Sequence, residues 1–147
     1  MNQRKAKDVI DAFEKVEKVI HEREKLPEGV LPSYMKLIDW IYQLSQKGKV
    51  KVSDLADVLG QSRPGITRAC KNMEELGLIT KKLNETDRRI VYVELTDKAV
   101  SYYFKYIDSY YEKLSFIFSE YDERKIDEMI EMIYQICEDM ERGKENE

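Results

Sequence analysis

The chain has 147 residues and a mass of 17.5 kDa, and 42% of its residues are hydrophobic while 37% are charged. This length predicts one domain, or one domain with an appended helical element, and the apolar content excludes a wholly disordered chain. No segment approaches 18 consecutive apolar residues, so a membrane-spanning helix is excluded, and Met1–Lys7 lack the apolar region of a secretory signal. We therefore expect a cytoplasmic protein without a membrane partner.

The net charge of −4 averages over an uneven distribution along the chain. Residues 61–89 carry seven basic and four acidic side chains, whereas residues 97–147 carry seven basic and fourteen acidic ones. An anionic partner is therefore expected to meet the middle of the chain. Cys70 and Cys137 are too few and too far apart for a disulfide framework or a Cys-rich zinc site, and we expect no metal and no cofactor.

Hydrophobic spacing predicts the elements of the first third of the chain. Apolar residues recur with a helical period over residues 6–25 and again over 33–46, and a segment with two prolines and a glycine separates the two runs. A very short strand is possible near residue 50. Ser53 is then expected to cap a short helix over residues 54–59.

The next helix has clear signals at both of its ends. Ser62 is a suitable N-cap, and Pro64 falls in the first helical turn, where its missing N–H group costs no hydrogen bond. The apolar spacing continues to about Leu76, and Gly77 is the expected C-cap. Together with the short helix before it, this helix forms a helix-turn-helix.

A β-hairpin and two long helices follow. Residues 78–83 and 90–95 read as strands joined by a turn, and the second strand alternates apolar and polar residues. Thr96 is expected to cap a helix over 97–118, and a last helix is expected over 122–141.

This order of elements predicts a mainly α fold with a small β-hairpin wing. Residues 31–96 are expected to form a winged helix-turn-helix domain that binds DNA. Residues 1–30 and 97–147 are expected to form a helical dimerisation region, because their apolar stripes are wider than the central domain can cover. A homodimer would place two such domains one DNA turn apart, which suits a palindromic operator in double-stranded DNA.

Polar and basic side chains gather on the second helix of this pair and on the hairpin. Such a helix fits the major groove, where Arg can bond guanine and Thr or Asn can reach a base or a phosphate. A cationic hairpin suits the minor groove. The expected DNA-binding residues are Ser62, Arg63, Pro64, Thr67, Arg68, Lys71, Asn72, Lys82, Arg88 and Arg89.

Several segments over residues 31–100 resemble the multiple-antibiotic-resistance regulator (MarR) family. They are Val52-Ser53-Asp54-Leu55-Ala56, Leu59-Gly60-Gln61-Ser62-Arg63-Pro64-Gly65-Ile66-Thr67-Arg68, Leu76-Gly77-Leu78-Ile79, Thr86-Asp87-Arg88-Arg89 and Val93-Glu94-Leu95-Thr96. The flanking helices match the six-helix plan of that family. The resemblance implies a dimeric, ligand-responsive transcriptional regulator, and a repressor is the expectation here.

The resemblance also implies roles for individual residues. Its Asp-x-Arg wing motif falls on Asp87 and Arg89, so Arg89 is expected to enter the minor groove while Asp87 braces the wing. Gly65 stands where the family usually has Ser or Thr, which removes one side chain from base contact. The family's effector pocket implies three candidate residues for a small aromatic ligand, namely His21, Trp40 and Tyr103.

Three alternatives remain open from the sequence. Cys70 lies in the predicted recognition helix and is either a core residue or a redox switch, as in a thiol-sensing regulator. Seven of the ten tyrosines lie in residues 102–134, where they form either core and dimer contacts or an aromatic effector cavity. The winged helix could also serve protein–protein contact alone. An enzyme is not expected, because a nucleophile–base set, a phosphate loop and metal ligands are all missing.

Overall fold

The computed structural model describes residues 1–145 and divides the chain into two compact units. The first unit is Met1–Tyr103, and the second begins at Phe104. Across the described residues, no helix is long and apolar enough to cross a membrane.

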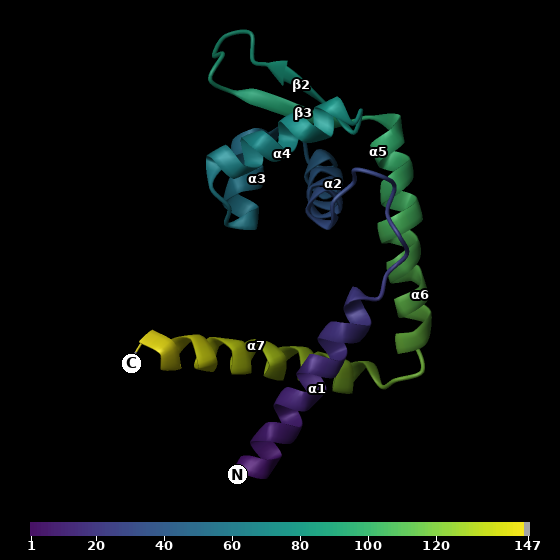
Figure 1. The fold of residues 1–147 in the computed structure, drawn as a ribbon, viewed down its shortest axis with the longest axis vertical. Coiled ribbons are helices and arrows are strands. Elements are labelled where there is room, and N and C mark those ends of the chain that lie inside the picture. The colour runs from purple at the N-terminus through teal and green to yellow at the C-terminus, as the bar shows by residue number, and fades with distance from the viewer. Residues whose placement is uncertain (146–147) are drawn as a thin grey trace. The chain divides into compact units, whose positions relative to one another are not determined.

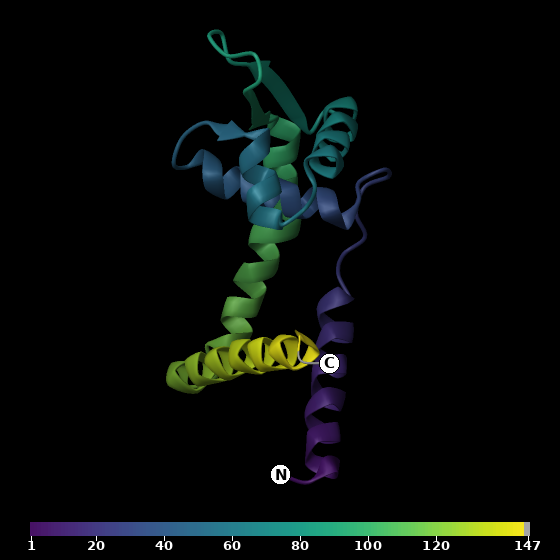
Figure 2. The ribbon, with the colours of Figure 1, turned by 90° about the vertical axis from the view of Figure 1, so that its left-hand side faces the viewer.

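The first unit contains the expected winged helix-turn-helix, with a three-stranded antiparallel sheet of order β1-β3-β2. Strands β2 and β3 form a hairpin that runs beside the second helix of the pair, and its tip projects beyond the helices (Figures 1 and 2). The elements are α1 (Gln3–His21), α2 (Pro32–Ser45), β1 (Val50–Lys51), α3 (Val52–Leu59), α4 (Arg63–Glu75), β2 (Ile79–Leu83), β3 (Val91–Leu95) and α5 (Asp97–Tyr102). The prediction of a mainly α fold with a β-hairpin wing is confirmed.

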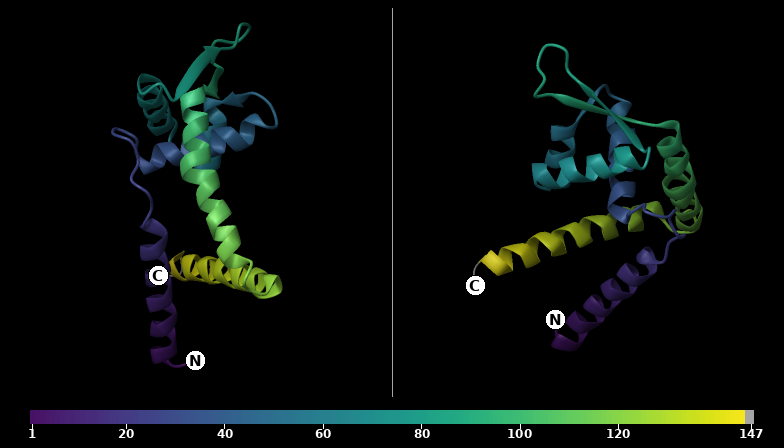
Figure 3. Two further views of the ribbon diagram at one scale, coloured as in Figure 1. Left: turned by 90° about the vertical axis from the view of Figure 1, so that its right-hand side faces the viewer. Right: turned by 45° about the horizontal axis from the view of Figure 1, so that its top comes forward.

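Helices α2, α3 and α4 enclose the core together with one face of the sheet (Figure 3). Helix α4 contributes Ile66, Cys70 and Met73, whose spacing of four and three residues places them on one side of a helix. The largest fully buried side chains are Ile38, Ile41, Leu55, Ile66, Met73, Leu78, Ile79, Val93 and Cys70. The opposite side of α4 is therefore the one that faces outward.

The register of the sheet separates an apolar inner face from a polar outer face. Val93 in β3 lies between Val50 and Lys81, and it is almost fully buried. Because side chains alternate along a strand, its neighbour Tyr92 projects from the opposite face, between Lys51 and Lys82.

The N-cap of α4 is Ser62 as predicted, whereas its C-cap is Leu76 rather than the predicted Gly77. The hydroxyl of Ser62 accepts a hydrogen bond from the backbone N–H of Gly65 at 3.3 Å. A Cβ atom at position 65 would lie 3.2 Å from that oxygen, so the glycine leaves room for the cap. Gly77 follows the helix with a φ of +71°, a conformation that glycine adopts at low cost.

Three helix starts differ from the sequence prediction. Helix α1 runs over Gln3–His21 rather than 6–25, because the side chain of Asn2 caps it by accepting from Lys5 N–H. Pro32 is the first residue of α2 rather than part of the break before it, which suits its fixed φ.

The prediction that Ser53 caps α3 is wrong. Helix α3 begins two residues earlier than predicted, at Val52, and its N-cap is Lys51. The carboxylate of Asp54 accepts the backbone N–H of Lys51 at 3.1 Å, which stabilises this earlier start.

The second unit is helical throughout most of its length. A π-helical turn, η1 (Tyr103–Asp108), leads from α5 into α6 (Ser109–Phe118), so the predicted single helix over 97–118 is interrupted. Helix α7 (Glu123–Glu145) is longer than the predicted 122–141. Its apolar stripe is exposed and includes Met129, Ile130, Ile133 and Met140.

Helix α1 also has an exposed apolar stripe. None of its described residues is buried, and the exposed apolar ones are Ile10, Val16, Val19 and Ile20. Both terminal helices thus present apolar surface to solvent in a single chain.

We predict that Ile66→Ala lowers the free energy of unfolding by about 2–5 kcal/mol, because Ile66 is completely buried in α4 and its loss leaves a cavity. Urea unfolding followed by far-UV circular dichroism measures this change. The control Val58→Ala removes an exposed side chain from α3 and should cost less than about 0.5 kcal/mol. Equal losses in the two variants would contradict this description of the core.

Candidate nucleic-acid interface

The outward side of α4 carries most of the residues that the sequence singles out. Arg63, Thr67, Arg68 and Lys71 are exposed on it, and Ser62 and Pro64 form its first turn. The start of the helix also points backbone N–H groups outward, and these carry the positive end of the helix dipole. This side therefore combines flexible cations, a hydroxyl and an electropositive helix end.

Asn72 does not share this outward position. Its side chain is half-buried, and its Nδ2 donates to the hydroxyl of Tyr34 in α2 at 3.1 Å. The structure thus uses Asn72 to tie α4 to α2, and a donor held in this way is poorly placed for a base edge.

The wing contains a compact pair formed by Asp87 and Arg89. One carboxylate oxygen of Asp87 accepts both the backbone N–H and the Nε of Arg89 at 3.1 Å, and the other accepts its Nη2 at 3.1 Å. The side chain of Arg89 nevertheless remains 91% exposed. The Arg89 side-chain and backbone donors hold the pKa of Asp87 below its usual range. This geometry agrees with the bracing role expected for Asp87.

Asn84 organises the turn at the tip of the wing, a role that the sequence prediction missed. Its Oδ1 accepts the backbone N–H groups of Thr86 and Asp87 at 2.9 and 3.0 Å. Its Nδ2 donates to the hydroxyl of Tyr92 at 3.0 Å. An Asn at the start of a turn is the available sequence signal, because its side chain mimics a backbone turn.

The cations of the hairpin point in different directions. Lys82 and Arg88 are exposed, as expected for residues that could meet a phosphate. Lys81 lies on the inner face of the sheet and is 3.5 Å from the carboxylate of Glu74 in α4. That ion pair connects the wing to α4.

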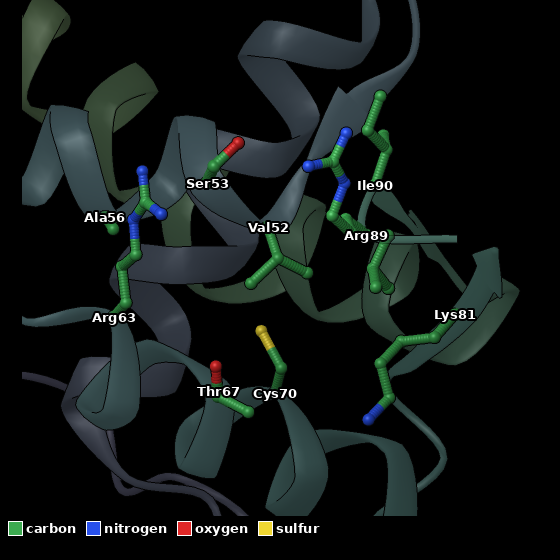
Figure 4. A pocket seen from close by; sticks show the side chains of 10 residues that line it. Val52, Ser53, Ala56, Arg63, Thr67, Cys70, Lys81, Arg89 and Ile90 are labelled. Atoms are coloured by element: carbon green, nitrogen blue, oxygen red, sulfur yellow. The ribbon is translucent and has the colours of Figure 1, made fainter. Parts of the chain in front are cut away.

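A pocket of about 380 Å³ lies where α3, α4 and the hairpin meet (Figure 4). Its cationic lining residues are Arg63, Lys81 and Arg89, and Thr67 and Ser53 add hydroxyl groups. The sulfur of Cys70 points into it beside Val52 (Figure 4). Residues of α3, of the start of α4 and of the wing therefore line one pocket, and three of them are cations.

Cys70 is a core residue by its surroundings. It is 1% exposed, and burial raises the pKa of its thiol, an effect that the Lys81 ammonium opposes and the Glu74 carboxylate reinforces. A thiol kept protonated in this way is a weak nucleophile. The geometry therefore favours packing over the redox switch left open by the sequence.

The three effector candidates are not brought together around this pocket. His21 lies on α1 with its side chain 75% exposed and 3.8 Å from Glu17. Tyr103 stacks on Tyr42 with ring centroids 3.8 Å apart, and its hydroxyl accepts from Gln43 at 3.1 Å. Trp40 lies on α2 and is 40% exposed. Within residues 1–145, no group of three or more His, Cys, Asp or Glu residues could hold a metal ion.

We predict that the pKa of Asp87 rises toward its ordinary value in Arg89→Ala, because the bonds from Arg89 stabilise the charged carboxylate. In the wild type the pair stays intact above that lowered pKa and is lost as the pH falls through it. Carbon-13 NMR of the Asp87 carboxyl over roughly pH 2 to 6 measures the midpoint. Arg88→Ala is the matched control and should leave it unchanged. Identical midpoints in the wild type and Arg89→Ala would contradict this geometry.

Comparison with known proteins identifies the family of the central segment. Residues 29–90 match the family model described as MarR family. An HTH-type transcriptional regulator of Bacillus subtilis, YfiV, is 38% identical over 56 residues, which are 38% of this chain. The aligned segment spans only 35% of the length of that relative.

Solved structures share the fold over almost the whole chain. FabT of Streptococcus pneumoniae, solved in complex with DNA, has a TM-score of 0.70 and 24% identity, covering 94% of this chain and 98% of that one. The S. aureus MepR–DNA complex has a TM-score of 0.63 and 17% identity, covering 77% and 81%. YusO of Bacillus subtilis has a TM-score of 0.64 and 17% identity, covering 94% and 98%. Residues 29–90 therefore match the MarR family model, and the chain shares the winged-helix fold of these solved structures.

Proposed function

We propose that this protein is a DNA-binding transcriptional regulator that recognises an inverted-repeat operator as a homodimer. One observation carries this proposal: Arg63 and Thr67 of α4 and the braced Arg89 of the wing line one pocket. Two cationic elements so arranged can engage adjacent grooves of one duplex. Support also comes from FabT and MepR, which share the fold and were solved bound to DNA.

In the proposed complex, α4 enters the major groove. Arg68 and Lys71 are exposed on its outward side, and Arg63 lies at its start. Arginine can bond guanine through two parallel hydrogen bonds, whereas lysine and the helix N–H groups suit phosphates. Thr67 adds a short hydroxyl, and Gly65 lets the backbone of the first turn approach the duplex.

The wing is proposed to enter the neighbouring minor groove. Asp87 fixes the Nε and Nη2 of Arg89, so the guanidinium loses less conformational entropy on binding than an unbraced one. Narrow A·T-rich minor grooves concentrate negative potential and attract arginine. Lys82 and Arg88 are proposed to contact phosphates beside that groove.

The homodimer is proposed from the exposed apolar stripes of α1 and α7. Ile130, Ile133 and Met140 on α7 and Val16 and Val19 on α1 are exposed in a single chain. Helices with uncovered apolar stripes require a partner, and a second copy of the same chain offers a matching surface. A two-fold axis would space the two α4 helices by about 34 Å.

We further propose that the protein represses transcription and leaves its operator when a small molecule binds. AdcR of Streptococcus pyogenes, a structure with the same fold, is named a repressor. The tyrosine-rich segment over residues 102–134 supports an aromatic ligand. The thiol-sensing alternative is weaker, because Cys70 is buried and its pKa is raised. A role in protein contact alone is weaker as well, because it would not require a wing with a braced cation.

The proposed function is tested by selecting bound sites from a pool of random duplexes with the purified full chain. The expected product is an inverted repeat whose half-sites lie about one helical turn apart, with A·T-rich flanks where the wings meet the DNA. A pool that yields no enriched sequence would contradict the proposal.

We predict that Arg68→Ala and Arg89→Ala weaken operator binding in different ways. If Arg68 reads a base, its loss costs about 1–3 kcal/mol and relaxes the preference at one position of each half-site. Loss of Arg89 should weaken binding to all sites, most strongly where the flanks are A·T-rich. Asp87→Ala should reproduce part of the Arg89 effect, because it releases the guanidinium. Binding measured across a library of operator variants distinguishes these patterns.

Lys15→Ala is the control for these three variants, because Lys15 is an exposed cation on α1, away from both proposed DNA-contacting elements. It should retain wild-type affinity and preference. An Arg89→Ala variant with unchanged affinity and unchanged flank preference would show that the wing does not read DNA.

We predict that the full chain has about twice its 17.5 kDa mass in solution and that Ile130→Lys with Ile133→Lys makes it monomeric. Both substitutions place a charge in the exposed apolar stripe of α7. Light scattering coupled to size exclusion measures the mass. Glu131→Lys changes the charge on the polar side of the same helix and should remain dimeric. A dimer that persists in the double variant would contradict this interface.

A further inference from the structure

The outer face of the wing sheet carries a cluster of lysines around one tyrosine. Lys51, Tyr92 and Lys82 lie directly opposite one another on β1, β3 and β2. Directly paired residues of neighbouring antiparallel strands project from the same face. Lys49 joins them, because its ammonium lies 5.2 Å from the centroid of the Tyr92 ring. We call these four residues the lysine face.

The lysine face is exposed and partly ordered by its own contacts. Lys49, Lys51 and Lys82 are exposed, whereas Tyr92 is half-buried. The hydroxyl of Tyr92 accepts from Asn84, which fixes the ring, and the ring in turn positions the ammonium of Lys49. The cations are therefore held close together, and such a cluster favours a partner with regularly spaced negative charges.

The charge of this face is strongly positive near the wing. Glu94 is an acidic residue on the same face, but it pairs with Thr80, two residues farther from the hairpin tip than the pair of Tyr92 and Lys82. Asp54 adds a second nearby carboxylate, which accepts the backbone N–H of Lys51, and the three lysines outnumber these two. A polyanion such as a phosphate backbone fits this arrangement.

The direction of the face follows from the alternation of β3. Val93 of β3 is almost fully buried, and its partner Lys81 contacts Glu74 of α4, so this side of the strand is the inner one. Tyr92 therefore projects away from α4. If α4 occupies one major groove and the wing tip the next minor groove, DNA that continues beyond the wing passes on the side of the lysine face.

We propose that the lysine face binds the phosphate backbone of the DNA that flanks each operator half-site, independently of its sequence. This inference rests on the proposed function and adds Lys49 and Lys51, which lie outside α4 and the hairpin, to the DNA-contacting surface. The contact lengthens the bound duplex beyond the segment that α4 and the wing tip read. It contributes affinity and not sequence preference, because phosphates carry no base information.

The test compares two duplexes and three proteins. One duplex contains only the selected operator, and the other extends it by about ten base pairs, one helical turn, on each side. The proteins are the wild type, the double variant Lys49→Gln with Lys51→Gln, and the control Lys36→Gln with Lys113→Gln. The control removes two exposed lysines from α2 and α6. Circular dichroism confirms that all three are folded.

The wild type and the control should bind the extended duplex about tenfold more tightly at low salt, the combined effect of four exposed charge pairs per dimer. The double variant should bind both duplexes with the affinity that the wild type has for the short one. Its plot of log affinity against log salt on the extended duplex should be shallower by about 0.9 for each phosphate that the variant no longer neutralises.

Each other outcome separates the inference from the proposed function. If the wild type binds the short operator but gains nothing from the extension, the inference is overturned and the proposed function stands. The inference is also overturned, and the proposed function stands, if the double variant still binds the extended duplex more tightly than the short one. An acidic protein surface would then be the partner of the lysine face. If the wild type binds neither duplex, both the proposed function and the inference fail.

Discussion

The burial of one side of α4 is the constraint on which the rest of the proposed DNA-binding surface depends. Ile66, Cys70 and Met73 are almost completely buried, so the helix can neither rotate nor slide without opening the core. Because the orientation of the helix is fixed in this way, its opposite side, which carries Thr67 and Arg68, faces outward. The apolar spacing of a single helix thus determines both the stability of the unit and the orientation of its polar groups.

The tip of the wing is stabilised differently from α4, because almost none of it is buried. Asn84 closes the turn through its amide, and Asp87 accepts three donors from Arg89. Short local hydrogen bonds therefore replace packing as the source of rigidity. The ion pair of Lys81 in β2 and Glu74 links the hairpin strands to α4, although an exposed pair of this kind contributes little stability by itself.

The sequence was sufficient where structure is determined by nearest neighbours along the chain. The cap at Ser62, the turn at Gly77 and the alternation of β3 follow from local chemistry, and all are confirmed. The sequence was insufficient where a contact spans distant segments. The period of α4 allows Asn72 to face outward, and only the position of Tyr34 in α2 shows that it is tied inward. The start of α3 is a similar case. The sequence allows Ser53 as the cap, and only the structure shows that the Asp54 carboxylate accepts the backbone N–H of Lys51 instead.

Because Gly65 has no side chain, the backbone of the first turn of α4 is uncovered at this position. A Cβ atom there would lie 3.2 Å from the Ser62 hydroxyl, so a larger residue would require the cap to shift slightly. A duplex can approach the backbone at this point more closely than elsewhere along the helix. In the proposed complex, this position would respond to the local width and curvature of the groove rather than to the identity of a base, and discrimination between bases would fall to the side chains one turn further along.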